Sequence, residues 1–227
     1  MPTFAASRRG LLLTAIVAAF APLVFLVSEA IAAIAWTAGT YDYGHNFISD
    51  LGTTLCGSTY GGREMCSPLH GVMNFGFVAM GLGVAVFVAL MASRLPIVRR
   101  VILTLLGLSV ALGMSLVAGF PGGAESVADG TIALHVLGAA IAIAAGNVLA
   151  IALGANGPRL GLAPWYRPLA IALGIIGLVG LALLGGGATA LDPAVFERIA
   201  VYAIFAWHLS TSAAHGIAVR RERMLRR

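Results

Sequence analysis

The sequence of 227 residues contains no lysine, only two cysteines, and few charged residues of either sign, which make up 10% of the chain. A soluble domain usually carries about 25% charged residues, because it needs a polar surface that faces water. The scarcity excludes a soluble enzyme and a disordered chain, and two cysteines are too few for a small disulfide-built secreted domain. Hydrophobic residues make up 59% of the chain, with a mean hydropathy of +0.96. The composition therefore predicts an all-α, polytopic integral membrane protein.

The basic residues are all arginines, fourteen in number, and they stand in short clusters between apolar runs. A nucleic-acid-binding surface would instead need a basic face with interleaved aromatic residues along a phosphate backbone. The net charge of +5 is therefore interpreted as a signal of membrane topology, and no nucleic-acid partner is expected.

Six apolar segments are long enough to cross about 30 Å of hydrocarbon at about 1.5 Å of rise per residue. They cover residues 11–36, 69–91, 101–119, 132–153, 169–190 and 199–219. The whole chain, residues 1–227, is predicted to be a single membrane domain in which these six helices form a bundle. The longest connection, residues 37–68, is predicted to be an outer loop.

The distribution of arginine predicts the orientation of these helices. Twelve arginines fall on the same side of the membrane as the N-terminus, and only Arg63 and Arg198 fall on the other side. Since short cytoplasmic loops carry the excess of arginine, both termini are predicted to be cytoplasmic and the loop 37–68 extracytoplasmic. The protein is expected in the cell membrane.

The N-terminus also resembles an export signal, because Arg8-Arg9 precedes an apolar run and Ala33-Ile34-Ala35 offers small residues of the kind that precede cleavage. The apolar run is longer than the 7–15 residues of a signal core, and it contains Glu29. Its length favours an uncleaved first span, while cleavage stays open.

The two cysteines, Cys56 and Cys66, both fall in the predicted outer loop. Thiols outside the cytoplasm are free to oxidise, so a disulfide between them is expected, with two unpaired thiols as the alternative. Closing so short a loop would contribute about 2–3 kcal/mol to its stability in the chain-entropy model.

Polar residues inside a membrane are rare, since a charged group costs about 2.5–3.5 kcal/mol even on the insertion scale, and those present usually face a bundle interior or a cavity. Here they are Glu29, His70, Asn74, His135, Asn147 and His208. The three histidines each belong to a span that enters from the outer side. We therefore expect them to point, together with Glu29, into one outward-opening polar cavity that binds a ligand, with the two asparagines contributing.

Chemistry is also suggested by the outer-loop segment from His45 to Gly52. Asp50 is a candidate to orient His45 or His70 by accepting a ring N–H, and Ser49 is a candidate nucleophile beside such a histidine. Catalytic roles are therefore assigned to these four residues and to His135. The alternative is that Ser49 or Asp50 caps a short interfacial helix.

Several strings carry a resemblance to a known family. They are Asn46 to Gly52, Cys66 to Asn74, Leu134 to Ala139, and Gly146-Asn147. Over nearly its whole length the chain resembles a bacterial and archaeal membrane family described only as a domain of unknown function. The resemblance implies a six-helix fold and brings no activity, substrate or cofactor. Phe47 to Gly52 is also similar to the Phe-Ile-Ser-Asp-x-Gly string of a eukaryotic six-helix family linked to lipid-anchor remodelling and lipid asymmetry.

The leading hypothesis is that the predicted cavity binds or modifies a lipid-like molecule from the outer leaflet. One alternative is a metal or haem site, since three histidines and a carboxylate are ligands that zinc accepts. A small transporter and a structural partner of a membrane complex are the others; glycines permit close or sliding helix contacts. His215 is interpreted as an interfacial residue of a basic tail attracted to anionic lipid. The reaction, cofactor and oligomeric state stay open.

Overall fold

The computed structural model describes residues 8–187 and 190–225. Its long helices are α1 (Arg8–Ile34), α2 (His70–Ala92), α3 (Ile97–Gly119), α5 (Ile132–Asn156), α6 (Tyr166–Gly185) and α7 (Pro193–Leu225). The shorter elements are η1 (Ile48–Gly52), β1 (Ser58–Tyr60), β2 (Arg63–Met65), α4 (Ala124–Ala128) and η2 (Gly157–Leu160). The fold is therefore helical, with one small hairpin that the all-α prediction did not include.

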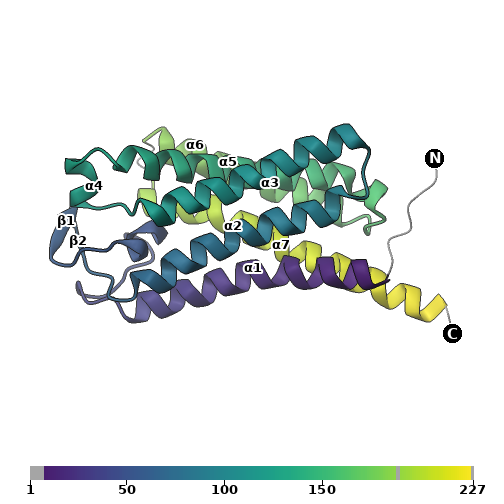
Figure 1. Ribbon diagram of the computed structural model, residues 1–227, viewed down its shortest axis with the longest axis horizontal. Helices are drawn as coiled ribbons and strands as arrows, with labels where there is room; N and C mark the ends of the chain where they lie inside the picture. Colours follow the sequence, from purple (N-terminus) through teal and green to yellow (C-terminus); the bar gives the residue numbers. More distant parts are fainter. Residues whose placement is uncertain (1–7, 188–189, 226–227) are drawn as a thin grey trace.

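The long helices lie side by side along the molecule (Figure 1). Each packs against the next along the chain, α7 returns to pack against α1, and α5 also contacts α7. The helices thus form a closed ring in sequence order. The hairpin and α4 lie at one end, called here the hairpin end; the start of α1 and the end of α7 lie at the other, called the terminal end (Figure 1).

In the described part of the chain, five helices are long and apolar enough to cross a membrane. They correspond to α1, α2, α3, α5 with η2, and α6. Large apolar side chains on them point outward, among them Phe20, Leu105 and Val179. This confirms the prediction of a membrane protein with several apolar helices.

Helix α7 is not among these five, although it is the longest. Its middle carries polar residues that lower its hydropathy, and His208, Thr211 and His215 among them are fully buried by the neighbouring helices. The predicted span 199–219 lies within α7. A helix whose polar side chains face its neighbours does not need an apolar surface all round.

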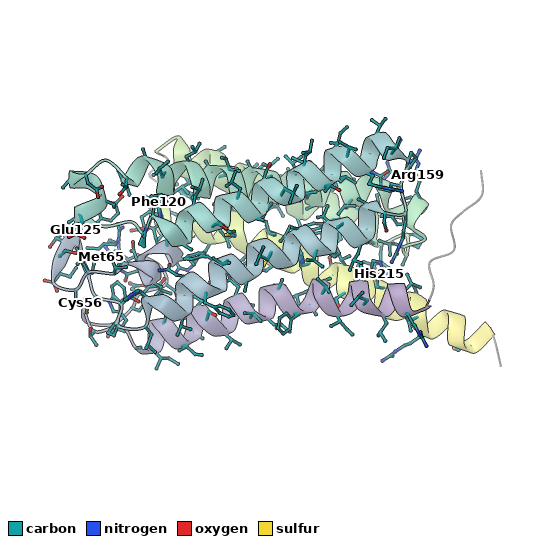
Figure 2. The ribbon with its side chains drawn as sticks, in the orientation of Figure 1. Cys56, Met65, Phe120, Glu125, Arg159 and His215 are labelled. Atoms are coloured by element: carbon teal, nitrogen blue, oxygen red, sulfur yellow. A yellow bond between two sulfur atoms is a disulfide. The ribbon has the colours of Figure 1, made fainter. Side chains whose placement is uncertain are left out.

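The first outer loop contains the hairpin. Strands β1 and β2 pair antiparallel, and Gly61 and Gly62 connect them with φ of +56° and +79°. Positive φ at both turn positions suits glycine because it has no Cβ. The predicted disulfide is confirmed: Cys56 and Cys66 are bonded on either side of the hairpin. Figure 2 shows Cys56 and Met65 at this end of the molecule.

Helices α3 and α5 approach closely where two glycines face each other. A Cβ on Gly113 would lie 2.5 Å from the carbonyl oxygen of Gly138, and a Cβ on Gly138 would lie 2.7 Å from that of Gly113. Backbone atoms of a neighbouring helix cannot move aside as a flexible side chain can. Small residues therefore set the distance between these two helices, as is typical of membrane helix pairs.

We predict that Gly113→Ala lowers the free energy of unfolding by about 1–3 kcal/mol, because the added methyl group overlaps the backbone of α5. Gly119→Ala is the matched control, since Gly119 lies on the same helix and a Cβ there would meet no atom within 4 Å. The control should leave stability unchanged or raise it by up to about 1 kcal/mol through helix propensity. Unfolding in detergent micelles measures both variants; equal effects would contradict the close contact.

Candidate functional site

Most of the buried charge of the described chain gathers at the hairpin end. Glu29, Asp50, Glu197 and Arg198 are all buried, with 2–8% of their surface exposed. They come from three segments: α1, the first outer loop with η1, and the first turns of α7. Buried charges are stable only when they are paired and hydrogen-bonded, so their partners define the site.

Helices α1 and α7 are joined by a carboxylate, a phenol and a guanidinium. Tyr202 donates from its hydroxyl to Glu29 Oε1 at 2.7 Å, and Arg198 Nη2 lies 3.8 Å from the same oxygen. Glu29 therefore has a hydrogen-bond donor and a positive charge beside it at a depth where an isolated carboxylate would be costly.

Arg198 also holds the first outer loop. Its Nη1 donates to the carbonyl oxygen of Asn46 at 2.6 Å, and its Nη2 donates to the Tyr41 hydroxyl at 2.6 Å. The guanidinium carbon lies 5.7 Å from the centre of the Tyr41 ring and 5.1 Å from that of Tyr43. Sequence reasoning assigned this arginine only to the count of outer charges. Its position on the outer side, where only one other arginine was expected, was the signal available.

The motif from Phe47 to Gly52 forms η1 and is held from both sides. Glu197 on α7 accepts the backbone N–H of Ile48 at 2.5 Å. Asp50 accepts the backbone N–H of Phe47 at 2.9 Å and two N–H groups of Arg63, at 2.9 and 3.2 Å. The Arg63 guanidinium lies over the Phe47 ring at 4.6 Å. Asp50 thus caps η1 and pairs with an arginine rather than with a histidine.

The end of η1 is fixed by the segment that opens α2. Ser67 donates its hydroxyl to the carbonyl oxygen of Leu51 at 2.6 Å, and Asn74 Nδ2 donates to that of Gly52 at 3.0 Å. A Cβ on Gly52 would lie 2.5 Å from Asn74 Oδ1, so only glycine fits. Two strings that are far apart in the sequence therefore bind each other.

The predicted catalytic residues lie in different surroundings. His45 Nδ1 is 2.7 Å from Asp192 Oδ2 at an exposed position, and His70 Nδ1 is 3.0 Å from the carbonyl oxygen of Ser67. His135 is buried, with Nδ1 2.9 Å from the carbonyl oxygen of Phe120. Among the described residues no hydrogen bond joins Ser49 to a histidine. Catalytic roles for these residues stay predictions.

The expected single cavity is not what the structure forms. Glu29 is bonded to α7 at the hairpin end, His70 and His135 open α2 and α5 against nearby backbone, and His208 is buried inside α7. The three helices that carry the histidines alternate with α1, α3 and α6 around the ring, which separates their first turns. In the described ranges no group of three or more His, Cys, Asp or Glu side chains is close enough to hold a metal ion.

His208 packs between Phe87 and Trp207, with a ring-centre distance of 4.7 Å to each. Neither ring nitrogen makes a hydrogen bond of standard geometry to a described group, but the ring interacts with the backbone of Ala18. Pro22 lies inside α1, and because proline has no N–H, the carbonyl of the residue four positions earlier loses its helical partner. That residue is Ala18. His208 therefore lies where α1 has a free carbonyl.

Asn147 lies where α5, α6 and α7 meet. Its Nδ2 donates to the carbonyl oxygens of Ile143 at 2.9 Å and Ala200 at 3.0 Å. A side chain at Gly177 would overlap the Asn147 amide, so α6 needs glycine there. The amide thus links three helices.

His215 is fully buried, which corrects its interpretation as an interfacial residue of a basic tail. Its Nδ1 is 2.9 Å from the carbonyl oxygen of Thr211, and its other ring nitrogen is 3.5 Å from Arg94. The position of His215 near the terminal end is visible in Figure 2. The helix face could not be assigned from a tail sequence that contains both arginines and apolar residues.

A pocket of about 340 Å³, called here the aromatic pocket, lies between the end of α1 and the first outer loop. Its lining residues are Ala33, Ile34, Trp36, Gly39, Thr40, Tyr41 and Tyr43. Burial raises the pKa of Tyr43, and the Glu29 carboxylate raises it further by more than the Arg198 guanidinium lowers it. The negative charge of Glu29 therefore dominates at the rim of this pocket.

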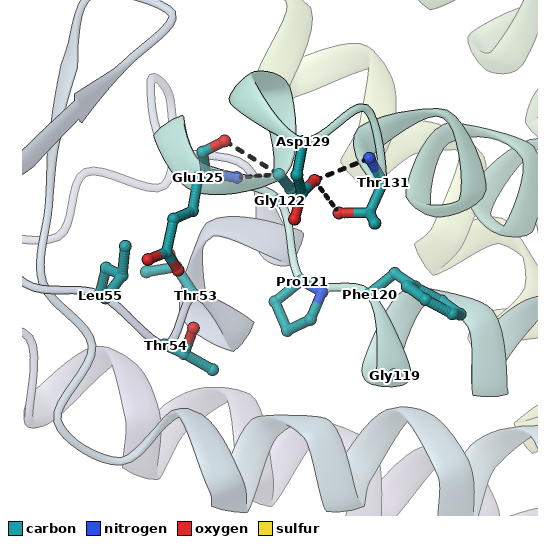
Figure 3. A pocket seen from close by; sticks show the side chains of 12 residues that line it. Thr53, Thr54, Leu55, Gly119, Phe120, Pro121, Gly122, Glu125, Asp129 and Thr131 are labelled. Atoms are coloured by element: carbon teal, nitrogen blue, oxygen red, sulfur yellow. Dashed lines mark hydrogen bonds between the residues drawn. The ribbon is translucent and has the colours of Figure 1, made fainter.

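A second pocket, of about 240 Å³, lies between the segment after η1 and the connection from α3 to α5 (Figure 3). In it Glu125 points toward Thr53 and Thr54. Asp129 accepts the N–H of Thr131 at 2.9 Å and its hydroxyl at 2.6 Å, and these hydrogen bonds lower the pKa of Asp129. One of its two carboxylates is thus already engaged within the protein.

Comparison with known families gives one match. The model of the family described as "Protein of unknown function (DUF998)" matches residues 6–214, so the chain belongs to this family. The resemblance to an uncharacterised membrane family is thereby confirmed. No curated protein and no solved structure matches the chain.

We predict that His208 and Pro22 are energetically coupled, because the histidine lies against the carbonyl that the proline leaves free. His208→Phe should lower the free energy of unfolding by about 0.6–1.7 kcal/mol, the range measured for hydrogen bonds between membrane helices. In a Pro22→Ala background, where the Ala18 carbonyl regains a helical partner, the same substitution should cost less than half as much. A double-mutant cycle in detergent micelles measures the coupling.

His215→Phe combined with Pro22→Ala is the control pair, since His215 bonds to Thr211 on its own helix. This pair should be additive within about 0.5 kcal/mol. Equal coupling in both cycles, or none for His208, would refute the link to the proline.

Proposed function

We propose that this member of the DUF998 family is a six-span membrane protein with both termini in the cytoplasm, and that its hairpin end binds a lipid-like molecule from the outer leaflet. The proposed function is binding. The acid–base roles of His45, Ser49, Asp50, His70 and His135 would be an addition to it. The single observation that carries the proposal is the aromatic pocket at the end of α1, with buried charges behind it.

The orientation is supported by the arrangement of arginine along the molecule. The connections at the terminal end carry Arg94, Arg99, Arg100, Arg159 and Arg167. At the hairpin end Arg63 and Arg198 each lie beside a carboxylate, Asp50 and Glu29 respectively. An excess of arginine marks the cytoplasmic side, which favours a cytoplasmic terminal end.

The sixth span would be α7. Its polar residues face α1, α5 and α6, as the contacts of His208, Asn147 and Tyr166 with neighbouring helices indicate. A span that hides its polar side chains in this way exposes little of them to lipid. Six spans place both ends of the chain on one side, as the ring arrangement requires.

Lipid binding is supported by where the aromatic pocket opens. Ile34, which lines it, is the last residue of α1 and is 86% exposed. Exposed apolar side chains continue along the same face of α1, every three or four residues: Leu13, Ile16, Phe20, Leu23, Val27 and Ile31. An acyl chain on this face would have its headgroup at the pocket. Tryptophan and tyrosine are the residues typical of this level of a membrane.

We predict the orientation from labelling with a membrane-impermeant maleimide in intact cells. Thr54→Cys, at an exposed position of the hairpin end, should be labelled, and Ser93→Cys, at an exposed position between α2 and α3, should be labelled only after lysis. The two native cysteines are bonded to each other and serve as the unlabelled background. The reverse pattern would overturn the proposed orientation.

We predict that the protein purified in mild detergent retains lipid in native mass spectrometry, and that Thr40→Trp reduces the retained lipid at least fivefold by filling the aromatic pocket. Thr59→Trp is the matched control, since Thr59 is exposed on β1 and lines a different pocket. Equal retention in both variants would refute the pocket as the site. Absence of lipid from the unmodified protein would refute lipid binding.

A further inference from the structure

We infer that the aromatic pocket accepts the ammonium group of a lipid headgroup. This inference rests on the proposed lipid binding and names the class of headgroup. The observations that carry it are the aromatic lining of the pocket, the sign of the charge behind it, and its position at the end of an apolar helix face.

The pocket offers a ligand aromatic ring surface rather than polar side-chain tips. The rings of Trp36 and Tyr41 meet edge-to-face with centres 5.5 Å apart, and those of Tyr41 and Tyr43 with centres 4.9 Å apart. Trp36 Nε1 donates to the carbonyl oxygen of Ala38 at 3.0 Å, and the Tyr41 hydroxyl donates to that of Phe47 at 2.9 Å. Both donors are therefore already used. Aromatic faces attract a cation through the ring quadrupole, most strongly at tryptophan.

The charges near the pocket also favour a cation. None of its seven lining residues is charged. Behind it lie two carboxylates, Glu29 and Glu197, and one guanidinium, Arg198, which sum to one negative charge when all are ionised. Arg198 is occupied by Tyr41 and by two backbone carbonyls. Since the effect of Glu29 at Tyr43 exceeds that of Arg198, an incoming cation meets a net attraction.

The position of the pocket favours a lipid over a free amine. Its mouth includes Ile34, at the end of the exposed apolar face of α1. A lipid gains contact for its acyl chain along this face in addition to the headgroup contact, and a soluble amine gains only the latter. The ligand is therefore a lipid with a phosphocholine or phosphoethanolamine headgroup.

The test uses the full chain in detergent with an equimolar mixture of three lipids that share the same acyl chains. Their headgroups are phosphocholine, phosphoethanolamine and phosphoglycerol, and native mass spectrometry measures how much of each is bound. Both ammonium-bearing lipids should be bound about fivefold more than the phosphoglycerol lipid, the ratio expected of a cation–π contact at a partly exposed site.

Two variants at one position separate ring from hydroxyl. Tyr43→Phe keeps the aromatic face and should keep the preference, whereas Tyr43→Leu should lose it. Trp165→Leu is the control, because Trp165 is an exposed aromatic residue outside the pocket. A preference for phosphoglycerol, or a preference that survives Tyr43→Leu, would overturn the inference.

The remaining outcomes distinguish this inference from the proposed function. Lipid bound without headgroup preference would overturn the ammonium assignment and leave lipid binding intact, whereas no bound lipid would overturn both. Soluble phosphocholine is added as a competitor and should not displace the lipid at equal concentration. If it does, the pocket binds free amines and the lipid assignment is wrong.

Discussion

The rest of the hairpin end depends on Arg198, a buried cation that three segments surround. It lies beside Glu29 of α1, it belongs to α7, and it donates to Asn46 and Tyr41 of the first outer loop. Burying a guanidinium is favourable only when its N–H groups find acceptors, so these segments must assemble together. One side chain therefore closes the helix ring between its first and last members and fixes the loop that covers this end.

The motif around η1 extends the same principle. Backbone N–H groups at the start of a short helix have no partners within it, and here the carboxylates of Asp50 and Glu197 supply them. The carbonyl groups at its end are satisfied by Ser67 and Asn74. Every polar group named here is bonded to another segment of the protein. This accounts for the motif through structure, and leaves the aromatic pocket as the open surface beside it.

The middle of the bundle is held by polar contacts of another kind. Asn147 joins α5 to α7, and the Tyr166 hydroxyl accepts hydrogen bonds from Trp207 and Thr211 of α7. Helix α7 is therefore the shared partner of α1, α5 and α6, which explains why its sequence is more polar than theirs. In hydrocarbon, where burial of apolar surface provides no driving force between helices, such hydrogen bonds and close glycine contacts determine the packing.

The sequence by itself determined the class of the protein, the approximate extent of its apolar helices and the disulfide between Cys56 and Cys66, because hydropathy and cysteine placement are local properties. It also singled out Glu29, Asp50 and Asn147 as unusual. Only the tertiary structure decided their partners: Tyr202 and Arg198 for Glu29, Arg63 for Asp50, and Ala200 for Asn147. A polar residue in a helix signals that it needs a partner, but the rotation and order of the helices choose which one. For that reason the three histidines expected in one cavity lie apart.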